Sequence, residues 1–282
     1  MENKTKDLTK VSFGIAIMFL LSWIYGFFIA GCLPISNLLK SIILLVGLYT
    51  IGLGLFIYIT KDVTENVYKK GKLSIKTYLT CFLLQFCALV LTMLINVLLI
   101  VFLNATPTGT DSLSLPMLFT LLVVAPILEE FVFRHIFAKK LLKYGEAFFV
   151  LVSAFCFCIV HGVSAGIPTI IYTFILGLIW SYLLVKTGNI WIPIIYHSMS
   201  NFFGAVLSQL ILIFSEKLFP IYFVLVILLA ITGLILFVRN KKDFTFEDKV
   251  FSKDNLKQLF TNKGIIFLIL ATVSFMLIKN II

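Results

Sequence analysis

Charged residues are scarce in this sequence. Lys, Arg, Asp and Glu together make up only 13% of the 282 residues, whereas hydrophobic residues make up 61%. A soluble domain of this length could not hide so much apolar surface, which excludes a soluble globular protein. The apolar runs are long and continuous rather than alternating with polar residues, which excludes a transmembrane β-barrel. We therefore predict an all-α, polytopic membrane helical bundle.

Nine apolar runs approach the length of about 20 residues that a membrane helix needs. They are 11–31, 38–60, 76–103, 116–138, 147–164, 167–186, 190–214, 219–239 and 264–280. The last run is short, so we expect eight or nine transmembrane helices. The lysines gather in alternate loops, and only Lys40, Lys217 and Lys279 fall in loops of the opposite side. The positive-inside rule then predicts a cytoplasmic N-terminus.

Three regions follow from the order of these runs. We predict an N-terminal three-helix region (1–103), a central helical core (104–214) and C-terminal helices (215–282) that include a basic loop (240–263). The core begins with a polar loop at 104–115. Because the basic residues lie in loops between apolar runs, we expect the lipid bilayer as a partner and no nucleic acid.

Other common signals are missing as well. The chain has five cysteines but no CxxC pair, so neither a disulfide framework nor a cysteine zinc site is predicted. No internal repeat and no low-complexity tract is present, which weighs against a transporter built from repeats. The chemistry therefore has to come from the few polar residues inside the apolar runs.

Two adjacent carboxylates, Glu129 and Glu130, lie within the apolar run 116–138. A charged side chain at bilayer depth costs roughly 2.5–3.5 kcal/mol on insertion scales, so such residues indicate a functional site. Glu130 and Arg134 are four residues apart on one helix face, which predicts an internal ion pair. Glu129 is rotated by about 100° from that pair, and it is the candidate general base. A polar network that only ties helices together is the alternative.

The histidines are also confined to apolar runs, and two of them accompany polar partners. His161 is a candidate to act with Glu129. His197 and Asn201 lie one turn apart, and both side chains can donate hydrogen bonds to a developing oxyanion. Helix–helix hydrogen bonding is the alternative. Residue counts from the helix ends place the group between the midplane and the cytoplasmic side, so we expect water to enter from that side.

Three motifs stand in a fixed order on three predicted helices. They are Glu129-Glu130-x-x-Phe133-Arg134, Phe157-x-x-x-His161 and His197-x-x-x-Asn201. In this order they resemble the CPBP family, which comprises the CAAX-type prenyl proteases and the bacteriocin-processing or self-immunity proteins, also called the Abi family. The resemblance implies an intramembrane endopeptidase with a conical helical bundle.

The resemblance also implies roles for individual residues. In that family the first glutamate and the histidine of the second motif activate a water molecule, and these correspond to Glu129 and His161. The histidine and asparagine of the third motif form an oxyanion hole, and these correspond to His197 and Asn201. The chain departs from the family pattern after the arginine, where His135 stands in place of the usual small residue.

The resemblance assigns a supporting role to the second glutamate and the arginine, here Glu130 and Arg134. The family is often labelled a metalloprotease, but this chain lacks an HExxH motif. We therefore favour water activation by glutamate and histidine without a cofactor. If a divalent metal such as zinc is present, its expected ligands are Glu129, His161 and His197.

The substrate is expected to be a peptide or protein at the membrane. Lysine outnumbers arginine by 21 to 2, which indicates an AT-rich bacterial genome and a multi-pass protein of a bacterial cell membrane. Leader or signal peptides, pheromone precursors or bacteriocin-related peptides then fit better than prenylated proteins. Two alternatives remain open, a non-catalytic regulatory or immunity protein on the same fold and a proton-coupled transporter.

Overall fold

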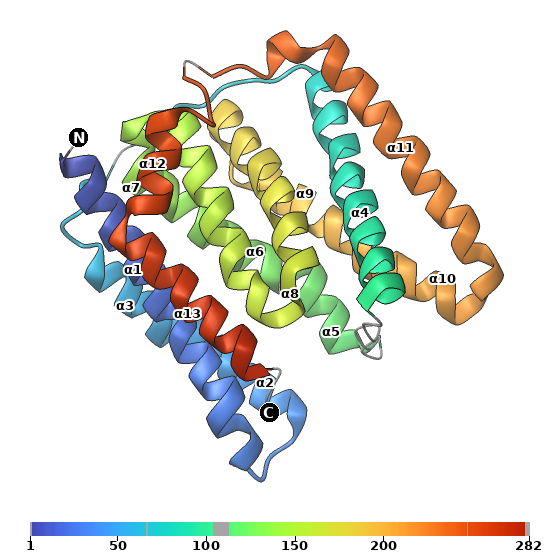
Figure 1. Ribbon diagram of the computed structural model, residues 1–282, viewed down its shortest axis with the longest axis horizontal. Coiled ribbons are helices and arrows are strands. Elements are labelled where there is room, and N and C mark those ends of the chain that lie inside the picture. Colours follow the sequence, from blue (N-terminus) through green and yellow to red (C-terminus); the bar gives the residue numbers. More distant parts are fainter. Residues whose placement is uncertain (1, 66, 104–112, 247, 280–282) are drawn as a thin grey trace.

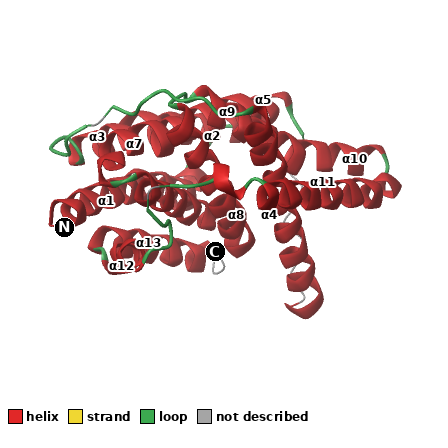
Figure 2. Ribbon diagram, turned by 90° about the horizontal axis from the view of Figure 1, so that it is seen from above, coloured by secondary structure: helices red, strands yellow, loops and turns green. Residues whose placement is uncertain are grey.

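The computed structural model describes residues 2–65, 67–103, 113–246 and 248–279. Figure 2 shows that every regular element drawn in these ranges is a helix. The α-helices are α1 (Glu2–Ile24), α2 (Asn37–Gly47), α3 (Leu53–Ile59), α4 (Ile75–Leu103), α5 (Leu115–Phe119), α6 (Ala125–Glu130), α7 (Phe137–Leu141), α8 (Glu146–Thr187), α9 (Trp191–Asn201), α10 (Ser208–Phe214), α11 (Phe219–Arg239), α12 (Lys253–Thr261) and α13 (Lys263–Lys279). Most of the predicted polar loop 104–115, namely 104–112, lies outside the described residues.

Several of these helices join into continuous spans. Those long and apolar enough to cross a membrane are Glu2–Cys32, Asn37–Ile59, Ile75–Phe102, Leu115–Tyr144, Glu146–Ser164, Gly166–Thr187, Trp191–Phe214 and Glu216–Arg239. A ninth span exists if α12 and α13, which are bent by 59° to each other, count as one. The predicted all-α polytopic bundle with eight to nine spans is confirmed for the described part of the chain, and the protein is a multi-pass membrane protein.

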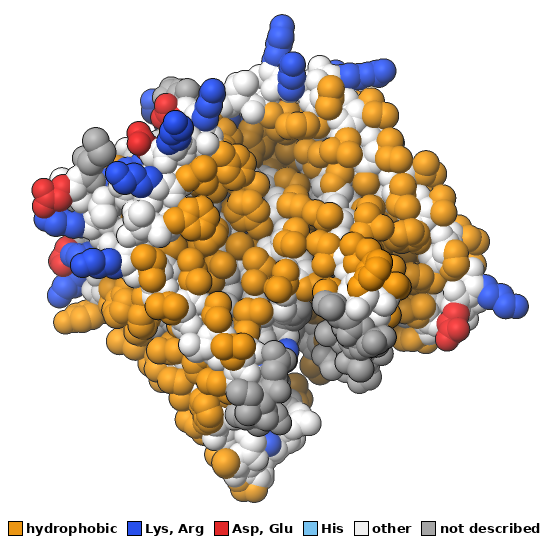
Figure 3. Space-filling view, in the orientation of Figure 1, with side chains coloured by type: hydrophobic (Ala, Val, Ile, Leu, Met, Phe, Trp, Pro, Cys, Tyr) orange, Lys and Arg blue, Asp and Glu red, His pale blue; other side chains and the backbone are white. Residues whose placement is uncertain are grey.

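Charge is concentrated at one end of the bundle. Figure 3 shows most of the Lys and Arg side chains along the upper left edge and top of the molecule, whereas hydrophobic side chains cover most of the visible flank. Figure 1 places the N-terminus and α12 at this lysine-rich end. The distribution is the one that the positive-inside rule describes. That this end faces the cytoplasm stays a prediction.

The first part of α8 is the centre of the bundle. In the span Glu146–Ser164, 78% of the most apolar window is buried, against 50% or less in every other candidate span. Helix α8 packs against both α4 and α13, while α1 pairs with α13 and α4 pairs with α11 (Figure 1). Lipid is as apolar as these side chains, so close packing rather than hydrophobic transfer holds such helices together.

Helix α8 is a hairpin of two arms. Gly166 at the bend has φ 76° and ψ −163°, a conformation open mainly to glycine, and Pro168 follows it. The arms approach so closely that a Cβ atom on Gly177 would lie 2.9 Å from the Cα atom of Ala154. The predicted break between the runs 147–164 and 167–186 is confirmed.

Three π-helical segments interrupt the spans that carry the polar motifs. Thr120–Val124 precedes α6, Phe131–Ile136 follows it, and Phe202–Leu207 follows α9. Each segment widens the helix from i→i+4 to i→i+5 hydrogen bonding and so changes which side chains face inward. Such bulges are frequent at functional sites.

Candidate active site

Three helices bring the predicted polar residues together around Glu129. Glu129 lies near the end of α6, His161 on the first arm of α8, and His197 on α9. The Oε2 atom of Glu129 is 3.5 Å from Nε2 of His161 and 3.8 Å from Nε2 of His197. The side chain of Glu129 is 18% exposed, whereas that of Glu130 is fully buried, so Glu129 is the carboxylate that a small molecule can reach.

Glu130 contacts two partners. Its Oε1 atom accepts a hydrogen bond from Nδ1 of His197 at 2.9 Å. Its Oε2 atom forms an ion pair with Nε of Arg134 at 3.1 Å, and both of these side chains are fully buried. The sequence predicted the ion pair but not the contact to His197. Glu130 therefore links the buried cation to the imidazole beside Glu129.

Aromatic rings surround the buried cation. The guanidinium carbon of Arg134 lies 4.4 Å from the ring centre of Phe157 and 5.2 Å from that of Trp180. Trp180 also stacks on His197, with ring centres 4.1 Å apart. Its indole N–H donates to Oε1 of Gln85 at 2.9 Å. These contacts fix the plane of the imidazole of His197 from one side while Glu130 fixes it from the other.

The orientation of His161 determines its chemistry. Its Nδ1 atom is 2.7 Å from the main-chain oxygen of Phe157, and a carbonyl oxygen can only accept a hydrogen bond. Nδ1 therefore carries a hydrogen, and Nε2 is the atom that faces Glu129. When the imidazole is neutral, Nε2 and the carboxylate are two acceptors side by side. A water molecule that lies beside this pair on the cavity side, within hydrogen-bonding distance of both atoms, could donate a hydrogen to each.

Asn201 makes a different contact from the other three predicted residues. Its Nδ2 atom donates to the main-chain oxygen of Leu121 at 2.8 Å, and Ser198 donates to the main-chain oxygen of Leu122 at 2.7 Å. Both acceptors belong to the π-helical segment Thr120–Val124. Asn201 thus ties α9 to the helix that carries Glu129, and the second hydrogen of its amide is available for a further bond.

The sequence left open a divalent metal ion held by Glu129, His161 and His197, and the arrangement of these side chains bears on that alternative. Within the described residues, no group of three or more His, Cys, Asp and Glu side chains has the spacing of a metal site. Glu129, His161 and His197 are the chemically suitable donors, but they do not form such a group here. We therefore derive no step that passes through a metal ion.

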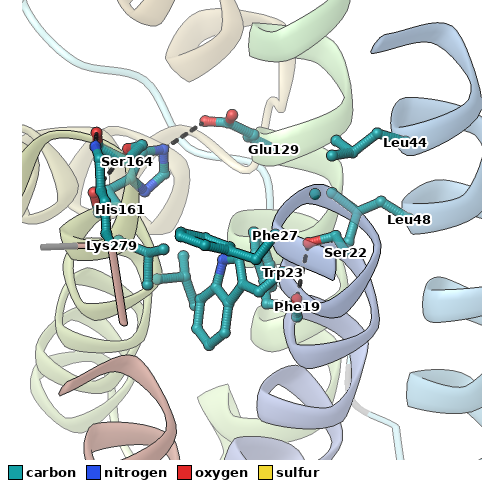
Figure 4. Close-up of a pocket in the computed structure, with 13 residues that line it drawn as sticks. Phe19, Ser22, Trp23, Phe27, Leu44, Leu48, Glu129, His161, Ser164 and Lys279 are labelled. Carbon is teal, nitrogen blue, oxygen red and sulfur yellow. Dashed lines mark hydrogen bonds and ion pairs between the residues drawn. The ribbon is translucent and has the colours of Figure 1, made fainter. Parts of the chain in front are cut away.

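A cavity of about 510 Å³ reaches Glu129 and His161 (Figure 4). Gly26, Ser164 and Lys279 on its wall are exposed, and they lie at helix ends opposite the lysine-rich end of the bundle. This cavity therefore lies toward the end opposite the lysine-rich end, whereas water was expected to enter from the lysine-rich side, and the route of water stays a prediction. Residue counts along single helices gave a depth, but they could not show which helices leave a gap beside the site.

Two residues of the site were not predicted from the sequence. Trp180 is an aromatic residue in an apolar run and has no signal of its own. Gln85 is a polar residue in the largely apolar helix α4 and is 4% exposed. An amide inside a transmembrane run is a signal for a buried hydrogen bond. It would not have identified Trp180 as the partner.

Comparison with known proteins gives a match to a family model and a match to one curated relative. Residues 111–203 match the family model of the type II CAAX prenyl endopeptidase Rce1-like proteins. The protein named "Putative membrane peptidase YdiL" of Bacillus subtilis (strain 168) is 34% identical over 87 residues, which are 30% of this chain and 34% of that protein. The chain therefore matches about a third of the length of this relative. No solved structure matches. The segment 111–203 includes α6, α8 and α9, which carry the site.

Proposed function

We propose that the protein is an intramembrane endopeptidase, because residues 111–203 match the family model of the Rce1-like CAAX prenyl endopeptidases and a relative is named a putative membrane peptidase. It hydrolyses a peptide bond of a peptide or protein that is associated with the membrane. The observation that carries this proposal is the separation of 3.5 Å between Oε2 of Glu129 and Nε2 of His161 on the wall of a cavity. Two facing acceptors at this distance suit a water molecule that is to be deprotonated.

In the proposed first step, the water beside Glu129 and His161 attacks the carbonyl carbon of the scissile bond. Its oxygen forms the new bond to carbon, and its proton passes to the carboxylate of Glu129. The negative charge that develops on the carbonyl oxygen accepts hydrogen bonds from His197 and Asn201. In the second step the carbon–nitrogen bond breaks, and Glu129 returns the proton to the leaving amine.

The surroundings of His197 support its role as a donor. Because Nδ1 already donates to the carboxylate of Glu130, donation from Nε2 requires the protonated imidazole. Glu130 is in turn paired with Arg134 at 3.1 Å, so its position beside the ring is fixed. This arrangement gives Glu130 an orienting role rather than a catalytic one.

The proposal is tested with the purified full-length protein in detergent or in liposomes. It is incubated with a complex mixture of peptides, and new chain ends are identified by mass spectrometry. We expect cleavage by the wild type and a loss of roughly 10²–10⁴-fold in Glu129→Gln and His161→Ala, the range for general acid–base catalysis. Glu216→Gln, an exposed carboxylate far along the chain, is the matched control. Equal cleavage by all four proteins would refute the assignment.

The non-catalytic alternative gives a different pattern. A regulatory or immunity protein on this fold would produce no new chain ends, and its cellular phenotype would survive Glu129→Gln. Comparative peptidomics of cells that carry the wild type or this variant separates the two cases. A peptide that accumulates only in the variant is the substrate candidate.

A further inference from the structure

The cavity beside Glu129 and His161 is built mostly by helices outside the matched segment 111–203. Its apolar walls come from α1 and from the region of α2, and they include Phe19, Trp23, Phe27, Leu44 and Leu48. Figure 4 shows these side chains grouped around one space, with Glu129 and His161 at its upper edge. Among the described residues that line it, Glu129 is the carboxylate and Lys279 the lysine.

Lys279 is held at this position by the main chain of α8. Its ammonium donates a hydrogen bond to the main-chain oxygen of Ser164. In an unbroken helix this oxygen would accept from residue 168, but Pro168 has no N–H and Gly166 interrupts the helix. The bend of α8 thus leaves an acceptor free, and Lys279 occupies it. An ammonium has three hydrogens, so two remain for another acceptor.

The position of this cation relative to the proposed reaction can be estimated along α8. Ser164 is three residues beyond His161, which corresponds to about 4.5 Å along the helix axis at 1.5 Å per residue. An extended peptide advances about 3.3–3.6 Å per residue. An anionic group bound by Lys279 would therefore lie one or two residues from the bond that faces Glu129 and His161.

We propose that Lys279 is a substrate-binding residue that receives a carboxylate of the peptide one or two residues from the scissile bond. The carboxylate belongs either to the carboxyl terminus of the substrate or to an Asp or Glu side chain. This inference rests on the proposed protease function. Its physical basis is charge complementarity: Glu129 repels an anionic peptide, and Lys279 on the same cavity wall offsets this repulsion. The residues on either side of the carboxylate lie against the aromatic wall.

A purely structural role of Lys279 would give a different experimental result from a role in substrate binding. If Lys279 only caps the oxygen of Ser164, its removal affects the stability of the bend and lowers the turnover of every peptide by the same factor. If it binds substrate, its removal changes the preference between peptides that differ only in one charge. The ratio of two substrates measured on one protein separates these roles, because a loss of folded protein cancels in the ratio.

The test uses a peptide that the wild type cleaves, taken from the mass-spectrometric screen, in matched forms. One pair has a free carboxyl terminus or a carboxamide, and a second pair has Asp or Asn within two residues of the cleavage site. For the wild type we expect kcat/KM to favour one acidic form by roughly tenfold or more, as for hydrogen bonds between charged groups. In Lys279→Met this preference should disappear through a higher KM, while Lys279→Arg retains part of it. Lys217→Met, an exposed lysine in another loop, is the control.

The outcomes distinguish this inference from the proposed function. If the wild type cleaves peptides and Glu129→Gln does not, but Lys279→Met leaves the preference unchanged, the protease stands and the role of Lys279 is refuted. Binding of the fluorescent acid and amide forms to Glu129→Gln gives a readout without turnover. Equal affinity for all forms in that variant would also overturn the role of Lys279.

Discussion

Nδ1 of His197 lies 2.9 Å from Oε1 of Glu130, the carboxylate that also pairs with Arg134. The second glutamate of the adjacent pair therefore connects a permanently charged, fully buried guanidinium to the imidazole beside Glu129. It holds one ring nitrogen of His197 and leaves Nε2 turned toward Glu129, at 3.8 Å. Two neighbouring carboxylates thus have different partners and different access to the cavity.

Removal of the charge on Glu130 should destabilise the protein. Glu130→Gln leaves Arg134 buried without its anion, and breaking a buried pair in this way costs about 3–5 kcal/mol. We expect a clearly lower melting temperature in detergent, followed with a thiol-reactive fluorophore that reports exposure of the buried Cys156 and Cys158. The double variant Glu130→Gln/Arg134→Met should melt at a higher temperature than the single variant. An unchanged melting temperature in Glu130→Gln would contradict the importance of the pair.

Asn201 and Ser198 offer a matched comparison on one helix. Both side chains donate to main-chain oxygens of the segment Thr120–Val124, so Asn201→Ala and Ser198→Ala each remove one tie between α9 and that segment. Only Asn201 is proposed to stabilise the oxyanion. We expect kcat to fall by roughly 10²–10³-fold in Asn201→Ala and by much less in Ser198→Ala. Similar losses in both variants would indicate that Asn201 acts only by positioning α9.

Chelation of metal ions should leave cleavage unchanged. The proposed steps use the side chains of Glu129, His161, His197 and Asn201 alone. We expect the purified protein to retain its rate after incubation with 1,10-phenanthroline or EDTA, and added zinc to give no stimulation. Elemental analysis of the same sample provides the metal content. A rate that disappears with the chelator and returns with one metal ion would refute the metal-free steps.

Gln85 should act on the reaction through Trp180. Gln85→Leu removes the acceptor of the indole N–H, and a neutral hydrogen bond contributes about 0.5–1.5 kcal/mol. If the indole then shifts against His197, kcat should fall by a corresponding few-fold to about tenfold while KM stays the same. Gln209→Leu on α10 is the control. An equal loss of kcat in that variant would refute the role of Gln85.

The bend of α8 should depend on glycine at one position. Gly166 has φ 76° and ψ −163°, where any other residue is strained by about 1–3 kcal/mol. Gly166→Ala should therefore lower the melting temperature. Gly47→Ala is the matched control, because no atom lies within 4 Å of the added Cβ and its φ is not positive. Equal melting temperatures of the two variants would show that the bend tolerates a side chain.

Much of the membrane architecture could be predicted from the sequence because length and hydropathy are local properties. The sequence separated the runs 147–164 and 167–186, and the structure bends α8 between them at Gly166. The ion pair between Glu130 and Arg134 followed from helical spacing, and the structure contains it as well. The roles of Glu129, His161, His197 and Asn201 in catalysis stay predictions.

Other contacts depended on distances between helices that no local pattern contains. Gln85 and Trp180 are far apart in the chain and meet only because α4 packs against α8. The π-helical turns around α6 shift side chains away from the ideal spacing of 100° per residue, so helical periodicity alone does not give the faces correctly. The position of the cavity beside Glu129 and His161 could not be predicted for the same reason, since a cavity is a property of several helices together.

The sequence by itself determined that this chain is a multi-pass helical membrane protein and which polar residues stand out inside its spans, because both follow from the cost of placing polar groups in lipid. Only the tertiary structure decided that Glu130 also binds His197 and that Glu129 opens onto a cavity. Glu129 lies beside His161 at the edge of this cavity, while Glu130 is enclosed with Arg134 and His197. Both features depend on the packing of α6, α8 and α9 against one another, which no pattern within a single helix contains.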